Sequence, residues 1–176
     1  MKNVLQTERL MLRCLVGADA PFILGLLNDP AWMRFIGDRG VRTVEAARAY
    51  LEERMISMYA RLGFGLWMVE LKEGGKPAGI CGLVKRDALP EVDLGFAFMP
   101  EYRGRGYAYE SALAVREHAV GALGLARLLA ITSPANAASV RLLERLGFAH
   151  EREMPWAGDE KDVVSVYAFG GSSVGP

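Results

Sequence analysis

Residues Arg103-Gly104-Arg105-Gly106-Tyr107-Ala108 form the most informative stretch of this 176-residue chain. They follow a strand-like apolar run over residues 92–99, which Pro100 closes, and they open a helix-like run over residues 107–120. Glycines at a strand-to-helix turn let backbone N–H groups face an anion, and the positive end of the helix dipole favours phosphate there. Two arginines add full positive charge. The stretch therefore predicts a phosphate-binding turn.

Two common nucleotide-binding motifs do not fit this turn. A dinucleotide fingerprint reads Gly-x-Gly-x-x-Gly, but Gly104 and Gly106 are followed by Tyr109 where the third glycine or alanine belongs. A P-loop contains Gly-Lys-Ser or Gly-Lys-Thr, which is absent here. What remains is the pattern Arg-x-x-Gly-x-Ala from Arg103 to Ala108. Taken alone, this pattern also fits an ordinary solvated turn.

Length and composition indicate one soluble globular domain, which we expect to span residues 1–170 and to be followed by a flexible tail over residues 171–176. Lys plus Arg and Asp plus Glu both number 21, so no overall field attracts nucleic acid or an anionic membrane. The N-terminus shows no hydrophobic signal segment, and no apolar run is long enough to span a bilayer. We therefore expect a cytoplasmic protein that binds neither membrane nor nucleic acid.

Cysteine and histidine usage points away from metal or thiol chemistry. Cys14 and Cys81 lie in apolar, strand-like runs, as is typical of buried reduced thiols. His118 and His150 are far apart, and no cysteine cluster accompanies them, so we expect no metal site. We expect His118 to lie on the solvated side of its helix.

The hydrophobic pattern predicts the order β, α, α, β, β, β, α, β, α, β, β. The expected strands span residues 9–15, 64–71, 77–85, 91–99, 127–132, 148–154 and 163–169. The expected helices span residues 19–28, 43–61, 107–120 and 136–146. Two consecutive strand-helix-strand units near the C-terminus require right-handed crossovers. We therefore expect a mixed sheet, in which an antiparallel meander joins a parallel section.

Over nearly the whole chain these segments resemble the GCN5-related N-acetyltransferase (GNAT) family. Arg103 to Ala108 matches its Q/R-x-x-G-x-G/A signature. Residues 7–13 (TERLMLR) resemble the opening of its RimJ/RimL-like branch, and residues 136–139 followed by LERLGF at 143–148 resemble its second signature. The resemblance implies an α/β (α+β) GNAT fold, with a central mixed, splayed sheet flanked by helices on both faces. It also implies a monomer or homodimer that moves an acetyl group directly from acetyl-CoA to a primary amine, either a protein N-terminus or a small molecule.

The resemblance further implies where acetyl-CoA would lie. Its pyrophosphate would be held by the turn residues Arg103, Gly104, Arg105, Gly106, Tyr107 and Ala108. The pantetheine arm would pair with the backbone near Phe98, on a strand that a β-bulge splays from residues 127–132. Phe96 and Phe98 would limit the room for the acyl tail. A backbone N–H of Phe98 or Met99 would stabilise the developing oxyanion.

The acceptor amine needs a base or a desolvating pocket, because an amine of pKa about 10.4 is almost fully charged at pH 7. Strand alternation places Glu91 and Asp93 on one face together with two small residues, which suggests a cleft. Asp93 occupies a position where many relatives carry a glutamate. We therefore take Asp93 as the first base candidate and Glu91 as the second, acting directly or through a water. A solvated acid on a half-exposed strand is the alternative for both.

The departing thiolate should gain a proton, and here the chain departs from the family pattern. Many relatives place a tyrosine five residues before the phenylalanine of the Gly-Phe pair, but this chain has Leu143 there. In the RimJ/RimL-like pattern N-x-x-S, Ser139 would lie near the coenzyme sulfur, and Asn136 would bind the pantetheine amide or hold the loop. Both residues also fit an ordinary helix start, with Asn136 as N-cap, and the two roles are compatible.

The acceptor itself stays open at this stage. Trp32 and Phe35 lie in a segment that walls the acceptor site in relatives, although aromatic residues more often belong to a core. Two other functions remain. One is an acyl-CoA-binding or sensing domain without catalysis, which the missing tyrosine favours and which Asp93 with Ser139 disfavours. The other is a transferase that uses a different acyl-CoA.

Overall fold

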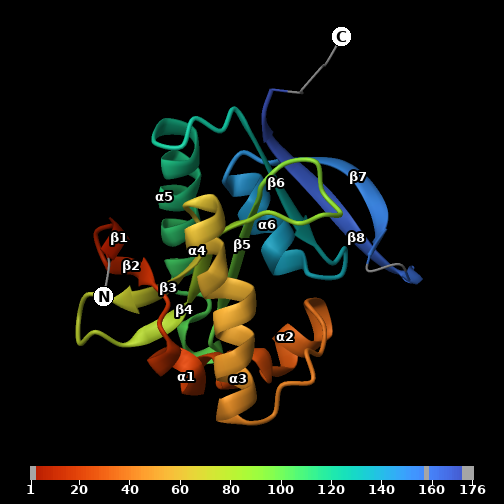
Figure 1. Cartoon of the computed structure of the whole chain (residues 1–176). Coiled ribbons are helices and arrows are strands. Elements are labelled where there is room, and N and C mark those ends of the chain that lie inside the picture. Colours follow the sequence, from red (N-terminus) through yellow and green to blue (C-terminus); the bar gives the residue numbers. More distant parts are fainter. Residues whose placement is uncertain (1–2, 157–158, 172–176) are drawn as a thin grey trace.

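Eight strands form one sheet in the order β1-β2-β3-β4-β5-β6-β8-β7 (Figure 1). The computed structural model describes residues 3–156 and 159–171. The strands are β1 (Asn3–Gln6), β2 (Leu10–Cys14), β3 (Leu66–Leu71), β4 (Pro77–Val84), β5 (Asp93–Phe98), β6 (Arg127–Thr132), β7 (Ala149–Trp156) and β8 (Asp159–Gly170). Neighbours are antiparallel except β5 and β6, which are parallel. The expected tail, residues 171–176, lies outside the described residues except for Gly171.

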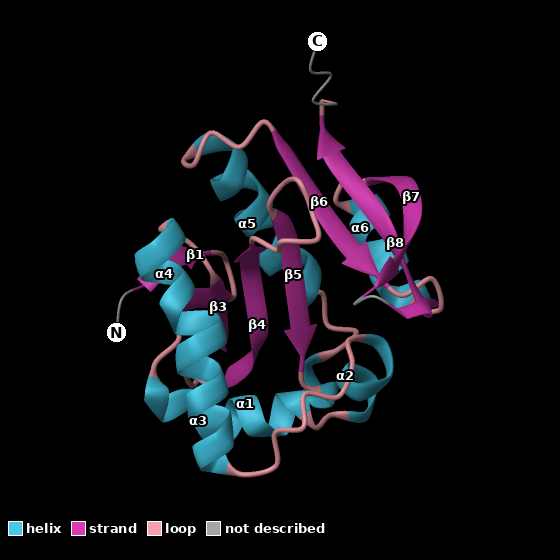
Figure 2. Ribbon diagram, turned by 45° about the vertical axis from the view of Figure 1, so that its right-hand side comes forward, coloured by secondary structure: helices cyan, strands magenta, loops and turns pink. Residues whose placement is uncertain are grey.

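Helices cover both faces of this sheet (Figures 1 and 2). One face carries η1 (Gly17–Asp19), α1 (Ala20–Leu27), α2 (Pro30–Phe35), α3 (Val44–Leu51), η2 (Glu52–Ile56) and α4 (Ser57–Leu62). The other carries α5 (Tyr107–Gly121) and α6 (Ala137–Arg145), and η3 (Pro100–Tyr102) lies between β5 and α5 along the chain. No described helix is long and apolar enough to cross a membrane.

The alternation of side chains along the strands divides the core into two layers. On the α5 and α6 side, β5 contributes Leu94 and Phe98 to a cluster with Val115 and Leu143. On the opposite side, Ala97 packs with the cluster under α1 to α3. Strand β5 is therefore covered on both faces, and its two rows of side chains point into two different layers.

The sequence pattern located most of these elements. The mixed sheet with helices on both faces is confirmed, and the expected strands and helices are found with ends moved by a few residues. The helix expected over residues 43–61 differs, because the π-helical segment η2 divides it into α3 and α4. The pattern also missed β1, α2 and the three-residue η3. β1 is a four-residue edge strand, and α2 is a six-residue helix that begins where the Asp29 carboxylate accepts from the N–H groups of Ala31 and Trp32. Both are too short to show a period.

Two side-chain expectations can also be compared with the structure. His118 is half-buried and meets the Trp67 ring edge-on at 5.8 Å, so the expectation that it is solvated was wrong. Helix packing against β3, which a single sequence cannot show, places it there. Cys14 and Cys81 are both free thiols, and burial raises the pKa of Cys81 to about 12.

Strand β4 is pressed so closely against the chain before β3 that one position requires glycine. A Cβ atom on Gly82 would lie 2.1 Å from the carbonyl oxygen of Gly65, which is backbone and cannot move like a side-chain end. That same carbonyl accepts the N–H of Leu83 at 3.0 Å, so any shift would strain a ladder bond.

We predict that Gly82→Ala lowers the free energy of unfolding by about 1–3 kcal/mol, the usual cost of overpacking. The matched control is Gly121→Ala at the end of α5, where a Cβ would meet no atom within 4 Å. That variant should be as stable as the parent or slightly more stable, because alanine is the better helix former. Urea denaturation of all three proteins measures the effect. Equal midpoints for the two variants would contradict the close approach.

Candidate active site

Strands β5 and β6 pair at a single position, Asp93 opposite Leu129, and the Leu129 N–H donates to the Val92 carbonyl at 2.9 Å. Beyond this bridge the two strands diverge (Figure 2). β6 is held to β8 at six successive positions, and β5 to β4 at six, so each strand follows a different neighbour. The pairing of β5 with β4 has no register shift, so the expected β-bulge is not found there. The splay results from the two competing neighbours.

The backbone of β5 beyond the bridge presents hydrogen-bonding groups to this gap. The Met99 N–H donates to the Ala78 carbonyl of β4 at 3.0 Å. Since an antiparallel pair alternates between bonded and non-bonded positions, the N–H and C=O groups of Phe96 and Phe98 point to the opposite edge, toward the gap. Of the two expected oxyanion donors, Phe98 is therefore directed into the gap, whereas the Met99 N–H is already used.

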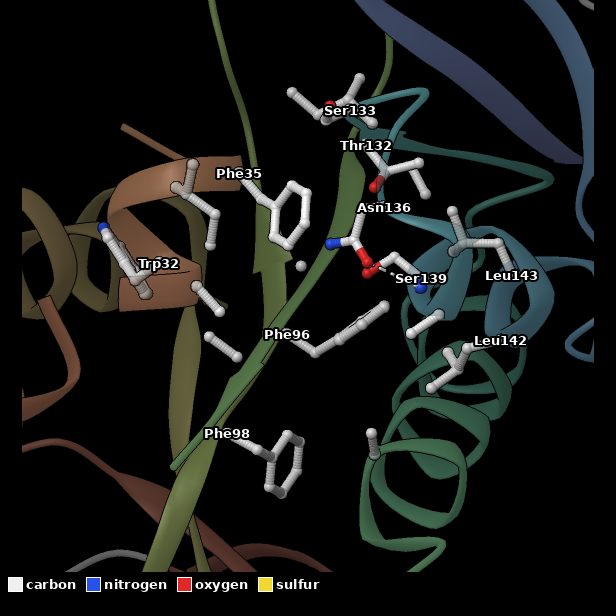
Figure 3. A pocket seen from close by; sticks show the side chains of 18 of the residues that line it. Trp32, Phe35, Phe96, Phe98, Thr132, Ser133, Asn136, Ser139, Leu142 and Leu143 are labelled. Atoms are coloured by element: carbon white, nitrogen blue, oxygen red, sulfur yellow. Dashed lines mark hydrogen bonds between the residues drawn. The ribbon is translucent and has the colours of Figure 1, made fainter. Parts of the chain in front are cut away.

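A cavity of about 940 Å³ passes through the gap. It is lined by side chains from both rows of β5: Phe96 and Phe98 on the α5 side, Asp93 and Ala97 on the other. Figure 3 shows Trp32 and Phe35 of α2 on one side of it, and Asn136 and Ser139 of α6 on the other. The cavity thus joins the two faces of the sheet.

The phosphate-binding turn lies at one end of this cavity. Gly104 and Gly106 have φ of +72° and +83°, a left-handed conformation that glycine adopts without strain. Gly106 is also the N-cap of α5, which is 15 residues long. Gly104, Gly106, Tyr107 and Ala108 all line the cavity. The glycine turn and the helix start expected from the sequence are therefore present, and the binding of phosphate there stays a prediction.

The two arginines of the turn differ in their contacts. Arg103 donates from Nε to the Phe98 carbonyl at 2.9 Å, and its Nη2 forms an ion pair with the buried Asp29 carboxylate. Arg103 therefore braces the turn against β5 and α2 and is not a free cation. Arg105 is exposed and is not among the residues that line the cavity. Its carbonyl accepts from Arg9 Nη1 at 3.1 Å.

Arg9 is a residue of this site that sequence reasoning did not identify. Its guanidinium pairs with Glu110 of α5 at 2.6 Å and lies over the Tyr107 ring at 4.6 Å. Thr7 also donates to the Glu110 carboxylate. These contacts tie the chain before β2 to the phosphate-binding turn. The segment TERLMLR was recognised as a motif, but its partner lies about a hundred residues away, so its role could not be read locally.

Asp93 lies deep in the cavity, with 1% of its surface exposed. Arg86 Nε lies 3.0 and 3.1 Å from its two carboxylate oxygens. Burial raises the pKa of Asp93, and the charge of Arg86 acts in the opposite direction. The solvated-acid alternative is thus contradicted for this residue. Arg86, which also lies over the Trp156 ring at 5.6 Å, was not identified from the sequence because it lies in an irregular connection.

Glu91, the second base candidate, is placed differently. It precedes β5, and its carboxylate forms an ion pair with Arg127 Nε at 3.5 Å. It is not among the residues that line the cavity. The strand alternation that grouped Glu91 with Asp93 does not apply, because the ladder with β4 begins only at Asp93.

The start of α6 forms the wall facing β5. The Asn136 side-chain oxygen accepts the N–H of Ser139 at 3.2 Å, so the N-cap role is confirmed. Both residues, with the buried Leu143, line the cavity (Figure 3). Among the described residues, no group of three or more His, Cys, Asp and Glu side chains is placed to hold a metal ion.

Known proteins resemble this chain in sequence and in fold. The family model "Acetyltransferase (GNAT) domain" matches residues 9–149. The uncharacterized protein YkkB of Bacillus subtilis (strain 168) is 30% identical over 156 residues, which are 86% of this chain and 88% of YkkB. The crystal structure of an acetyltransferase from Agrobacterium tumefaciens str. C58 superimposes with a TM-score of 0.80 at 29% identity, over 97% of this chain and 95% of that one.

A solved structure of lower sequence identity has the same fold. RimL, a ribosomal L7/L12 alpha-N-protein acetyltransferase solved in complex with coenzyme A, superimposes with a TM-score of 0.80 at 19% identity, covering 96% of this chain and 97% of RimL. The family model spans most of the chain, including the phosphate-binding turn, the splayed strands and the start of α6. This chain therefore belongs to the GNAT acetyltransferase family, in its RimJ/RimL-type group.

Proposed function

We propose that this acetyltransferase moves an acetyl group directly from acetyl-CoA to a primary amine, with Asp93 as the base and Ser139 as the hydroxyl beside the coenzyme sulfur. The observation that carries the proposal is the continuous cavity, which joins a glycine-rich helix start to a buried carboxylate through the gap between β5 and β6. The family uses acetyl-CoA, and the solved RimL structure contains coenzyme A.

The residues present fit the coenzyme along its length. The start of α5 offers backbone N–H groups and a positive dipole end to the pyrophosphate. The gap-facing N–H and C=O groups of Phe96 and the N–H of Phe98 offer an extended chain such as pantetheine the pairing that β6 leaves unused. The Arg103 Nε bond to the Phe98 carbonyl leaves the N–H of Phe98 as the donor for a carbonyl oxygen that gains negative charge. When bound, acetyl-CoA supplies a thioester whose acyl carbon an amine can attack.

The transfer itself needs one proton acceptor and one proton donor. The amine nitrogen forms a bond to the acyl carbon, the carbon–sulfur bond breaks, and the amine proton passes to the Asp93 carboxylate directly or through a water. The sulfur leaves with the bonding electrons and takes a proton through the Ser139 hydroxyl. Burial raises the pKa of Asp93, which makes it a stronger base than an exposed aspartate while it stays ionised. The charge of Arg86 favours the ionised form of Asp93.

One observation favours a second candidate function. Leu143 is buried and lines the cavity where many relatives carry a proton-donating tyrosine. A chain with this substitution could bind an acyl-CoA, acetyl or longer, without transferring its acyl group. Independent measurements of CoA binding and of turnover by the parent protein separate the two functions.

We predict that Asp93→Asn lowers kcat/KM by about 10²- to 10⁴-fold, the usual contribution of a general base. Ser139→Ala should lower it by about tenfold, the equivalent of one hydrogen bond. Thiol release from acetyl-CoA with an amine panel measures turnover, and thermal stabilisation by CoA measures binding. The controls are Asp87→Asn, an exposed aspartate of the β4–β5 connection, and Ser57→Ala on α4; both should keep parental turnover.

Three results would overturn parts of this proposal. Full turnover in both site variants would remove the assigned roles. CoA-induced stabilisation without turnover of any amine by the parent protein would establish the binding-only function. Stabilisation by none of acetyl-, propionyl- or butyryl-CoA would contradict acyl-CoA binding altogether.

A further prediction concerns pH. In Arg86→Gln the buried Asp93 loses the charge that opposes desolvation, so its pKa rises further and the acidic limb of the kcat/KM profile moves to higher pH. The activity deficit should shrink as pH rises. Arg86→Lys retains a charge and should shift the limb less. An unchanged limb in Arg86→Gln would contradict the role of Asp93 as base.

The raised pKa of Asp93 also determines how the free energy of unfolding depends on pH. Because the folded pKa of Asp93 lies above the unfolded value, ionised Asp93 disfavours folding at any pH above the folded pKa. That penalty is relieved as pH falls through the folded pKa, and it should be larger in Arg86→Gln.

A further inference from the structure

We infer that the acceptor is the α-amine of a peptide whose N-terminal residue carries an apolar side chain, such as leucine or phenylalanine. The inference rests on the proposed function and names the acceptor of the same site. It follows from the apolar surface and the charge of the cavity end formed by α2 and the segment after it, and from the carboxylate chemistry of the proposed base, which lines the same cavity.

The α2 end of the cavity is walled by large apolar side chains. Trp32 is 7% exposed and Phe35 is half-buried, and both line the cavity on the side opposite α6 (Figure 3). Met33 and Ile36 line it too, yet they are 38% and 39% exposed. Among the described residues only four large hydrophobic side chains are that exposed, so two of the four border this opening. An apolar group on the acceptor would cover surface that water now contacts.

The Asp29 carboxylate connects this apolar wall to the phosphate-binding turn. Asp29 accepts the N–H groups of Ala31 and Trp32 at the start of α2 and forms the ion pair with Arg103. Arg103 in turn holds the Phe98 carbonyl. The aromatic wall and the strand that would hold the pantetheine arm therefore keep a fixed spacing, which suits an acceptor read by shape.

The charges at this end do not suit an acceptor with a second ammonium group. Arg34 and Arg39 line the cavity there, with the Arg34 guanidinium stacked over the Phe35 ring at 4.9 Å. Of the described lining residues, the acids are Asp93, which is paired with Arg86, and the exposed Asp162. Two arginines repel further cations and accommodate a neutral or anionic peptide.

The base also favours an α-amine. A side-chain ammonium of pKa about 10.4 is neutral in fewer than one part in a thousand at pH 7, whereas a peptide α-amine of pKa about 7.7 is neutral in roughly one part in six. A carboxylate is a weaker base than either amine, so it assists an amine that is often already neutral far more readily than one that is almost always charged. In this step the amine nitrogen bonds to the acyl carbon and its proton goes to Asp93. The carbon–sulfur bond breaks, and the sulfur takes a proton through the Ser139 hydroxyl, so that the coenzyme leaves as free thiol.

The test compares kcat/KM for acetyl-CoA with tetrapeptides that differ only in the first residue, leucine, phenylalanine, serine or aspartate, and with leucinamide and spermidine. Leucine and phenylalanine peptides should exceed the serine peptide by about tenfold or more, as apolar pockets discriminate, and should exceed spermidine by more. Comparable rates for leucinamide and the leucine peptide would overturn the peptide part of the inference. Equal or faster rates with the serine peptide, the aspartate peptide or spermidine would overturn the apolar part.

Met33 and Ile36 form the exposed apolar rim of this opening, and variants of these two residues make the test specific to this surface. Met33→Ser and Ile36→Ser should each raise KM for the leucine peptide about threefold to tenfold and leave the serine peptide unchanged. Leu62→Ser is the matched control, because Leu62 is 37% exposed but lies on α4 and does not line the cavity. Thermal melts verify folding of each variant. If rim and control variants behave alike, the rim does not read the acceptor. No turnover of any amine by the parent would instead contradict the proposed function.

Discussion

The structure of this acetyltransferase depends on one constraint: β5 and β6 are parallel neighbours that share a single bridge, because each is bound along its length to a different antiparallel partner. The gap exposes the N–H and C=O groups of Phe96 and the N–H of Phe98, which a complete sheet would have satisfied, while the Phe98 carbonyl accepts from Arg103. It also lets one cavity connect the two faces of the sheet. The phosphate-binding turn can therefore lie on one side and the α2 wall on the other, and Asp93 lies at the bridge that joins β5 to β6.

A small set of ion pairs holds these parts in place. Asp29 and Arg103 join α2, β5 and the phosphate-binding turn, and Arg9 with Glu110 joins that turn to the N-terminal strands. Arg86 forms an ion pair with Asp93. Without such a partner, the buried carboxylate would resist losing its proton, and its charged form would destabilise the fold. Arg103, which looked like a ligand for phosphate, is thus part of the frame, and we propose that the anion binds to the backbone of Gly104 and Gly106 and to the start of α5.

Local patterns in the sequence were enough to predict the sheet, the long helices and the glycine turn, because each depends on neighbours along the chain. They also led to Asp93 and to the N-cap role of Asn136. They failed where the answer is tertiary. Glu91 and Asp93 looked equivalent on a strand, but only the ladder with β4 shows that the strand starts between them. Arg86 and the partners of Arg103 are contacts between distant segments, and α2 is shorter than any period that could reveal it.

The central claim is that the gap edge of β5 holds the pantetheine arm of the coenzyme. Residue-resolved amide hydrogen exchange, with and without saturating acetyl-CoA, tests it most directly. The account predicts that exchange at Phe98, and to a lesser extent at Phe96, slows strongly in the complex. Exchange at Ala97 and Met99, whose N–H groups face β4, should change little. A saturated complex in which Phe96 and Phe98 exchange as fast as in the free protein would contradict the account.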